Sequence, residues 1–358
     1  MRRFRPGSGL APVPVGAAVF VLLCMAAATS ACGVCAGSVN VSSPAATAGH
    51  VARSPALPAR WVAVSVATLW VKPGQARPLD APACSYPADP RAWVQAMGTS
   101  QKLWLDGRLE TQALYATKVY VLSVSGNWSK VAVVGQPTPR NARGYPGWVP
   151  TRQLTAHAPS AGLRTAVVRR PTAWLWASAD LTGRVLEFSY DTRLPAVSWN
   201  AGSVEVVMLD GRHLYLRRSA VALHSPGAVW PRPTAAQVVA EAKTFLGLQY
   251  LWGGTSGFGF DCSGFTHSVC DALGVTIPRD AARQAGGGTK IPSRTALQPG
   301  DLVFFKDSSG YIHHVGMYVG GGTMIHSPST GRPVGYASLS DEPYRSEFAG
   351  GARYLAAQ

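Results

Sequence analysis

The chain has 358 residues, of which 47% are hydrophobic and only 14% are charged. This balance excludes a chain that is disordered throughout and leaves room for two or three domains with buried cores. The formal net charge of +15 indicates either an anionic partner or a basic surface that simply faces solvent. The sequence implies no metal and no cofactor.

Residues 1–36 have the layout of a signal peptide. Three arginines among the first five residues precede an apolar stretch, 13–28, that is too short for a comfortable membrane span. Small residues before Cys32 are typical of a lipoprotein signal, in which Cys32 becomes the lipid-bearing first residue. The alternative is an uncleaved anchor. We therefore predict an exported protein that meets the membrane only through its signal or a lipid anchor. Its basic charge is then attracted to the anionic cell envelope rather than to nucleic acid.

The next predicted elements are a linker and a β-rich segment. Residues 37–59 are rich in Ser, Ala, Pro and Gly, a composition typical of a flexible tether. Between residues 60 and 157 short apolar runs alternate with turns, and two of them predict hairpins, over 103–109 and over 119–134. Many short strands with Gly and Pro turns favour a small β-barrel over helices.

A second β-rich segment, 160–225, repeats this pattern. Apolar runs flank Asp-Gly-Arg over residues 204–216, which predicts another hairpin and a second small barrel in tandem with the first. After a Pro-rich linker the pattern changes to a helical one. Thr234 and Gln237 form a capping box ahead of an apolar helical face, and we expect residues 232–358 to fold as one compact α+β domain.

A second helical pattern begins at Asp261-Cys262-Ser263-Gly264, directly after the Gly-rich run 250–260. With Asp261 as N-cap, Cys262 falls in the first turn, where free N–H groups and the helix dipole favour a reactive thiolate. Cys270 lies eight helical residues further on, about 12 Å away, which is too far for a disulfide. The alternative of a buried, inert thiol suits Cys270 better than Cys262. The glycines predict close approach of backbone segments, although an ordinary Gly-rich loop has the same composition.

Two predicted strands, 314–319 and 323–326, each carry a histidine. If the three glycines between them form a hairpin loop, His314 and His326 are diagonal neighbours on one face, about 7 Å apart and within reach of each other. A two-residue loop would place them on opposite faces. The neighbouring His313 points to the other face, so we expect it to be structural.

Four motifs of the C-terminal part occur together in one known family. They are, in chain order, Tyr250-x-Trp252-Gly-Gly, Asp261-Cys262-Ser263-Gly264, His314-Val-Gly-x-Tyr318 and His326-Ser327. Over residues 232–358 the chain therefore resembles the NlpC-type cysteine peptidases. The resemblance implies a papain-like α+β fold, in which the cysteine helix packs on an antiparallel sheet. It also implies hydrolysis of the γ-D-glutamyl–diamino acid bond in peptidoglycan stem peptides.

The resemblance assigns a role to each motif residue. Cys262 matches the nucleophile, His314 the general base and His326 the group that orients this base. Tyr250 would help backbone N–H groups near the nucleophile to stabilise an oxyanion. The residues expected to contact the substrate are Asp261 and Ser263.

The upstream part resembles one branch of this family, the dipeptidyl-peptidase VI type, which places two bacterial SH3-like barrels before the peptidase domain. The motifs that carry this likeness are Trp70-Val-Lys-Pro73, Thr111-Gln-x-Leu-Tyr115, Gly144-Tyr145-Pro-Gly-Trp148-Val-Pro150 and Gly254-Thr-Ser-Gly-Phe-Gly-Phe-Asp-Cys262. In that branch a Glu and a Tyr of the first barrel hold the free amine of an L-Ala-γ-D-Glu substrate, and Glu110 and Tyr145 match them. The alternative is that Glu110 follows a surface hairpin while Tyr145 packs in the barrel core.

The predicted architecture is thus two small all-β SH3-like barrels followed by a papain-like NlpC-type domain. The predicted activity is that of a cysteine peptidase acting on stem peptides with a free N-terminal L-Ala. A different class of function is a catalytically silent envelope-binding protein that uses its barrels and keeps the peptidase fold as a relic. The intact cysteine, the two histidines and Tyr250 favour the enzyme.

Overall fold

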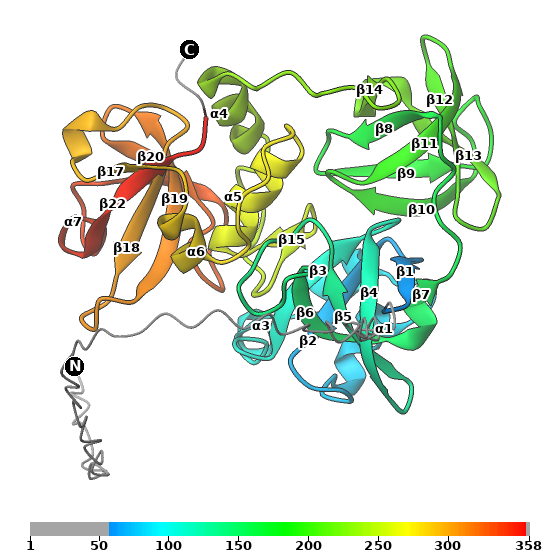
Figure 1. Cartoon of the computed structure of the whole chain (residues 1–358), viewed down its shortest axis with the longest axis horizontal. Coiled ribbons are helices and arrows are strands. Elements are labelled where there is room, and N and C mark those ends of the chain that lie inside the picture. The colour runs from blue at the N-terminus through cyan, green and yellow to red at the C-terminus, as the bar shows by residue number, and fades with distance from the viewer. Residues whose placement is uncertain (1–56, 356–358) are drawn as a thin grey trace, which may run out of the picture. The chain divides into compact units, whose positions relative to one another are not determined.

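The structure is a computed structural model that describes residues 57–355 of the chain (Figure 1). The predicted signal peptide, the lipidation site Cys32 and most of the predicted linker 37–59 lie outside the described residues. Within residues 57–355, no helix is both long and apolar enough to cross a membrane. Three antiparallel sheets of six or seven strands follow one another along the described chain.

The first sheet has seven strands in the spatial order β3-β2-β6-β5-β4-β1-β7. They are β1 (Ala59–Val62), β2 (Val66–Trp70), β3 (Leu109–Leu114), β4 (Lys118–Ser125), β5 (Trp128–Val133), β6 (Tyr145–Pro150) and β7 (Leu154–Thr155). Alternate residues of these strands face inward, as the strand pleat requires. Leu69, Val119, Val131 and Val133 are each at most 1% exposed and belong to one apolar core.

A helical insert separates β2 from β3. It consists of η1 (Pro78–Asp80), α1 (Ala81–Cys84), α2 (Pro90–Gln95) and α3 (Thr99–Leu103). The predicted hairpin over 103–109 is therefore wrong, because Leu103 ends α3 and Leu109 begins β3. Leu105 and Leu109 are buried beside Trp93 of α2, in a core that the insert shares with Trp70 of β2 and with Leu251. The apolar run thus packs against helices instead of pairing as two strands.

The other two predicted hairpins are confirmed. β4 and β5 pair from Val119↔Val133 to Ser125↔Trp128, and the turn between them holds Gly126 at a φ of 56°. Positive φ of this size favours glycine, so the turn residue decides where the hairpin bends. The Asp-Gly-Arg turn of the second β-rich segment likewise joins two paired strands, β12 (Ser203–Val207) and β13 (His213–Arg217).

The second sheet repeats the strand order of the first. Its order is β10-β9-β13-β12-β11-β8-β14, which is the order of the first sheet with every strand number raised by seven. The remaining strands are β8 (Arg164–Val168), β9 (Thr172–Trp176), β10 (Arg184–Ser189), β11 (Arg193–Trp199) and β14 (Val221–His224). A 3-10 helix precedes the last strand of each sheet, η2 (Thr151–Gln153) in the first and η3 (Arg218–Ala220) in the second. The tandem all-β arrangement predicted from the sequence is confirmed.

The third part mixes helices with a six-stranded sheet of order β17-β22-β18-β19-β20-β21. Its elements are α4 (Ala235–Lys243), β15 (Thr255–Ser256), β16 (Gly259–Phe260), α5 (Cys262–Asp271), α6 (Ala281–Gly286), β17 (Thr289–Ile291), η4 (Arg294–Ala296), β18 (Leu302–Lys306), β19 (Ile312–Gly320), β20 (Thr323–His326), β21 (Gly335–Ser338), α7 (Tyr344–Glu347) and β22 (Phe348–Arg353). α5 packs on β19 (Figure 1), with Phe265 and Val269 in one core with Val315 and Met317. The predicted α+β class, with a cysteine helix on an antiparallel sheet, is confirmed.

The start of α4 follows the predicted capping box. The Thr234 hydroxyl accepts from the N–H of Gln237 at 3.2 Å, and the Gln237 side chain accepts from the N–H of Thr234 at 2.8 Å. Both free donors are thereby satisfied at a helix end. The apolar face behind the cap is buried, with Val238 and Ala242 at 0% exposure.

The loop between β19 and β20 differs from the prediction. Thr323 pairs with Gly320, so the loop has two residues, Gly321 and Gly322, whose φ angles are 59° and 73°. A three-glycine loop would pair Thr323 with Val319, and that expectation is wrong. The register shifts next to Val319, which acts as an extra residue in its strand. This bulge offsets the shorter loop and keeps the rest of the hairpin in the expected register.

Candidate active site

Cys262 is the first residue of α5, and Asp261 precedes it as the N-cap, as predicted. The Asp261 Oδ1 atom accepts a hydrogen bond from the N–H of Gly264 at 2.6 Å. The side chain of the cysteine is nearly enclosed, at 9% exposure. The thiol therefore lies beside the free N–H groups of a helix start, where an anion is stabilised.

The glycine-rich run before α5 brings distant backbone segments together. A Cβ at Gly264 would lie 1.9 Å from the carbonyl oxygen of Gly254, and a Cβ at Gly257 would lie 1.7 Å from that of Pro171. Real side chains never approach backbone oxygens so closely, so both positions need glycine. The predicted close approach is confirmed: the start of α5 lies against its own loop, and that loop lies against the β8–β9 turn.

The resting thiol is less acidic than the helix position alone suggests. Burial, followed by the negative charge of Asp261, raises the pKa of Cys262 to about 12. The N–H groups of Val315 and Ser263 donate toward the sulfur and lower the pKa by less. Desolvation of the charged form therefore opposes the thiolate that the helix N-terminus favours. A base must take the proton when the sulfur attacks.

The two histidines of β19 and β20 lie on one face and bond to each other. Beyond the bulge Met317 pairs with Ile325, and the Nε2 atom of His314 lies 2.8 Å from the Nδ1 atom of His326. His313 points away and pairs with the carboxylate of Glu347 at 3.0 Å. The predicted diagonal contact is confirmed, together with the outward position of His313.

Both imidazoles are neutral at neutral pH. Burial, followed by the charges of His326, His313 and Arg332, holds the pKa of His314 well below its usual value. Burial, followed by the charge of Arg332, lowers the pKa of His326 to about 4. Because the Nε2 atom of His314 is engaged with His326, its Nδ1 atom is the one that can take a proton from a thiol.

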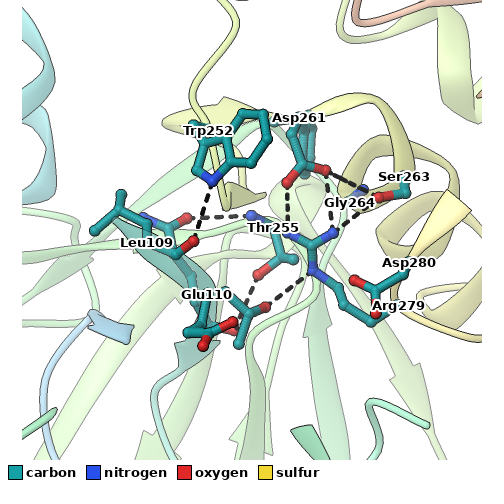
Figure 2. Close-up of polar contacts among 12 residues, drawn as sticks. Leu109, Glu110, Trp252, Thr255, Asp261, Ser263, Gly264, Arg279 and Asp280 are labelled. Carbon is teal, nitrogen blue, oxygen red and sulfur yellow. Dashed lines mark hydrogen bonds and ion pairs between the residues drawn. The ribbon is translucent and has the colours of Figure 1, made fainter. Parts of the chain in front are cut away.

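Asp261 and Ser263 bind a buried arginine that the sequence analysis did not single out (Figure 2). Arg279 is 2% exposed, and its Nη2 atom lies 2.6 Å from Asp261 Oδ2. Its Nη1 atom donates to Ser263 Oγ at 3.0 Å, and its Nε atom donates to Thr111 Oγ1 on β3 at 3.0 Å. One guanidinium therefore ties the start of the cysteine helix to the first sheet.

Glu110 and Tyr145 also meet partners that the sequence analysis missed. Arg140 holds both oxygens of Glu110, at 2.5 and 2.7 Å, and its Nη1 atom donates to the Tyr145 hydroxyl at 3.2 Å. That hydroxyl donates in turn to Asp280 Oδ1 at 2.8 Å. The ring of Tyr145 packs in the core of the first sheet, as the alternative interpretation expected, while its hydroxyl reaches the third part of the chain.

One cavity of about 420 Å³ joins these groups. It is lined by six of the predicted site residues, Glu110, Tyr145, Tyr250, Asp261, Cys262 and Ser263. His314 and His326 do not line it, although His313 and Ile312 of the same strand do. Burial, followed by the charges of Cys262 and Asp261, raises the pKa of Tyr250 well above its usual value, so this phenol keeps its proton and can donate a hydrogen bond.

Comparison with known proteins agrees with this geometry. Residues 247–353 match the NlpC/P60 family, and residues 168–224 match the YKFC SH3b2 domain. A Bacillus cereus protein named gamma-D-glutamyl-L-lysine dipeptidyl-peptidase is 43% identical over 302 residues, which cover 82% of this chain and 90% of that protein. The chain belongs to the NlpC/P60 family. Since members of this family are cysteine peptidases, the chain is an enzyme of that class.

Two further relatives of this NlpC/P60 peptidase cover most of its length. A Bacillus subtilis protein of the same name is 37% identical over 288 residues, covering 79% of this chain and 95% of the relative. The crystal structure of an NlpC/P60 family protein from Bacillus cereus superposes with a TM-score of 0.78 at 42% identity and covers 83% of this chain. The likeness therefore extends over both all-β parts as well as the peptidase part.

The NlpC/P60 motifs predicted one wall of the cavity better than the other. The wall from α5 carries only residues that the motifs named, whereas Arg140, Arg279 and Asp280 belong to no motif that the sequence analysis used. Arg279 and Asp280 stand directly before α6, and this place in the chain is the only local signal that they offer. Their partners lie at the start of α5 and in the first sheet, at least 16 residues away in sequence, so no local pattern pairs them.

Proposed function

We propose that this chain hydrolyses the γ-D-glutamyl–diamino acid bond of peptidoglycan stem peptides. The observation that carries the proposal is the single cavity in which the Cys262 thiol and the acidic group Glu110 of the first sheet both stand. A peptide bound there would present a carbonyl to the thiol at one end and its amine to a carboxylate at the other. The names of the Bacillus cereus and Bacillus subtilis relatives support the same bond.

Cys262 is the proposed nucleophile and His314 the proposed general base. As Sγ attacks the γ-carbonyl carbon of D-Glu, the thiol proton moves to the Nδ1 atom of His314. His326 holds the imidazole through its Nε2 atom at 2.8 Å. The carbonyl oxygen becomes an oxyanion, which the N–H groups at the start of α5 and the hydroxyl of Tyr250 stabilise.

The second half of the reaction reverses the proton flow. The imidazolium gives its proton to the amine of the diamino acid, the C–N bond breaks and a thioester remains on Cys262. Water then attacks the thioester, His314 takes a proton from it, and the proton returns to the sulfur as the dipeptide leaves. Neutral thiol and neutral imidazole are the resting states at both ends of the cycle.

The proposed amine site consists of Glu110 and Tyr145, with Asp280 beside them. A buried ammonium requires an anionic partner, and a substrate whose amine is blocked leaves that partner without one. Asp261 and Ser263 are proposed to contact the peptide from the opposite wall, with their orientation fixed by Arg279. The enzyme should therefore prefer stem peptides with a free N-terminal L-Ala.

The nucleophile can be tested against a cysteine on the same helix. In the Cys262→Ala variant we expect kcat/KM on an L-Ala-γ-D-Glu-diamino acid peptide to fall roughly a thousandfold or more. Cys270 is also in α5 and buried, so Cys270→Ala serves as the matched control and keeps activity. Mass spectrometry should find L-Ala-γ-D-Glu as the product. Cleavage at another bond, or full activity in Cys262→Ala, contradicts the proposal.

We further propose that the chain is exported and acts in the cell envelope. Residues 1–36 serve as the signal, Cys32 carries the lipid, and 37–59 tether the SH3-like units 60–157 and 160–225 and the peptidase domain 232–358. One lipid chain holds a protein at a membrane only weakly, so the attraction of the basic protein to the anionic membrane surface would strengthen the anchoring. Mass spectrometry of the mature N-terminus tests this, and an unmodified start at another residue rejects lipidation.

A further inference from the structure

The carboxylate proposed to hold the substrate amine already has a cation from its own chain. The guanidinium of Arg140 contacts both oxygens of Glu110, at 2.5 and 2.7 Å, which is the two-pronged geometry that makes such pairs specific. The same guanidinium lies over the ring of Tyr145, 5.2 Å from its centroid. Arg140 thus already donates hydrogen bonds to both Glu110 and Tyr145, the two groups of the proposed amine site.

The arginine belongs to the loop between β5 and β6, whose base is held while its tip faces solvent. Gln136 donates to the carbonyl of Gln112 at 2.7 Å, and the carbonyl of Pro137 accepts from the N–H of Arg279 at 3.2 Å. The side chain of Arg140 is 44% exposed, whereas that of Glu110 is only 12% exposed. The cation can therefore swing into water, while the carboxylate remains in the cavity.

The three carboxylates that line the cavity differ in their partners. Asp261 is paired with Arg279 at 2.6 Å, and Glu110 is paired with Arg140. Asp280 accepts a hydrogen bond from a phenol, and among residues 57–355 no cation lies within ion-pair distance of it. An ammonium entering the cavity would find Asp280 open and Glu110 occupied.

We propose that Arg140 is a specificity-determining residue that competes with the substrate ammonium for Glu110. The inference rests on the proposed function. A free amine must displace the guanidinium, which weakens its binding. A blocked amine leaves the Glu110–Arg140 pair in place and so avoids the cost of a carboxylate without a partner. Arg140 therefore reduces the ratio by which the enzyme binds a free amine more tightly than a blocked one.

The test measures binding, so that it does not depend on turnover. In the Cys262→Ala background, calorimetry gives the Kd of L-Ala-γ-D-Glu and of its N-acetyl form, with and without Arg140→Gln. We expect Arg140→Gln to strengthen binding of the free-amine dipeptide about two- to fivefold, because competition from a half-exposed ion pair weakens binding by no more than about that factor. Binding of the N-acetyl dipeptide should weaken or stay the same.

Two controls separate competition from a general effect of the loop. Arg143 lies in the same loop and stacks on Tyr120 outside the cavity, so Arg143→Gln should change neither Kd. In the Glu110→Gln variant, the further change Arg140→Gln should leave the Kd of the free-amine dipeptide unchanged, because the carboxylate for which the two cations compete is gone. Equal changes for both dipeptides, or weaker binding of the free amine in Arg140→Gln, overturn the proposal. If the wild type fails to cleave stem peptides, the proposed function fails, and these affinities still decide whether Arg140 competes.

Discussion

The first and second sheets have the same strand order but contact opposite ends of the cysteine helix. The first sheet reaches the N-terminal end of α5 through Thr111 and Arg279, and it lines the cavity with Glu110 and Tyr145. Among the described residues, none from the strands of the second sheet lines that cavity. With the same topology, one sheet lines the cavity beside the Cys262 thiol, and the other contacts the far end of the cysteine helix.

The second sheet supports the helix through two arginines. Arg169 donates to the carbonyl of Ala272 at 2.8 Å, and Arg193 donates to that of Asp271 at 2.8 Å. These carbonyls end α5, where cations complement the helix dipole. The comparison shows that the difference between the sheets comes from a few side chains at their edges and loops, because the strand framework is shared.

The largest effect on stability should come from removing Arg279, the buried cation that joins the first sheet to the start of α5. Arg279→Met leaves the carboxylate of Asp261 buried without a cation beside it, and we expect a loss of about 3–5 kcal/mol in the free energy of unfolding. Urea unfolding measures it. The matched control is Arg345→Met, which breaks the exposed pair with Glu342 and should cost less than about 0.5 kcal/mol. A loss below about 1 kcal/mol in Arg279→Met would mean that the buried pair does not anchor the helix.

The next largest effect concerns the substrate rather than stability. Glu110→Gln removes the charge proposed to bind the ammonium, so kcat/KM on the free-amine peptide should fall about tenfold. The free energy of unfolding should change little, because the lost pair with Arg140 is partly exposed. Kinetics on free and blocked peptides check this. An equal fall on both substrates would assign Glu110 to the structure of the loop instead of to the amine.

A smaller effect is expected from the second sheet. Arg169 bonds to the end of α5 and pairs with Glu241 of α4 at 2.6 Å. Arg169→Gln should lower the free energy of unfolding by about 1 kcal/mol, and the ratio of kcat/KM on free and blocked peptides should stay as in the wild type. Thermal unfolding and the same pair of assays measure both. A changed substrate ratio would show that the second sheet also shapes the site.

The last prediction concerns the protonation of the thiol. Because burial raises the pKa of Cys262 to about 12, the thiolate fraction should rise about tenfold per pH unit from pH 6 to 10. The rate of alkylation of Cys262 by iodoacetamide should follow that slope, with Cys262→Ala as the blank for other thiols. A rate that is already constant above pH 5 would indicate a resting thiolate and would restore the role first expected of the helix dipole.

Local pattern predicted the parts of this molecule that depend on neighbours in sequence. The cap at Asp261, the helix start at Cys262 and the strands that carry the two histidines follow from turn residues and periodicity. The predicted loop between β19 and β20 was one residue too long. The two histidines were nevertheless placed on the correct face of the sheet, because the bulge at Val319 offsets this error. The resemblance to known motifs added roles that periodicity cannot supply.

Contacts between polar residues that are distant in sequence could not be predicted in this way. Arg279 and Thr111 are 168 residues apart, and Arg140 and Glu110 are 30 apart. With 33 basic and 18 acidic residues in the chain, no local pattern says which of them pair. The helical insert before β3 was missed for a related reason, since its short helices show no long amphipathic period and bury their apolar residues in a core that includes the distant Leu251.

The role of the first sheet at the proposed amine site is tested most directly by comparing two substrates of the wild-type enzyme. One is the free L-Ala-γ-D-Glu-diamino acid peptide, and the other is the same stem attached to muramic acid through its alanine nitrogen. We expect a higher kcat/KM for the free peptide in the wild type, and we expect Glu110→Gln to bring the ratio of the two kcat/KM values close to one. Equal kcat/KM on both substrates in the wild type would contradict the claim that the first sheet completes the substrate site.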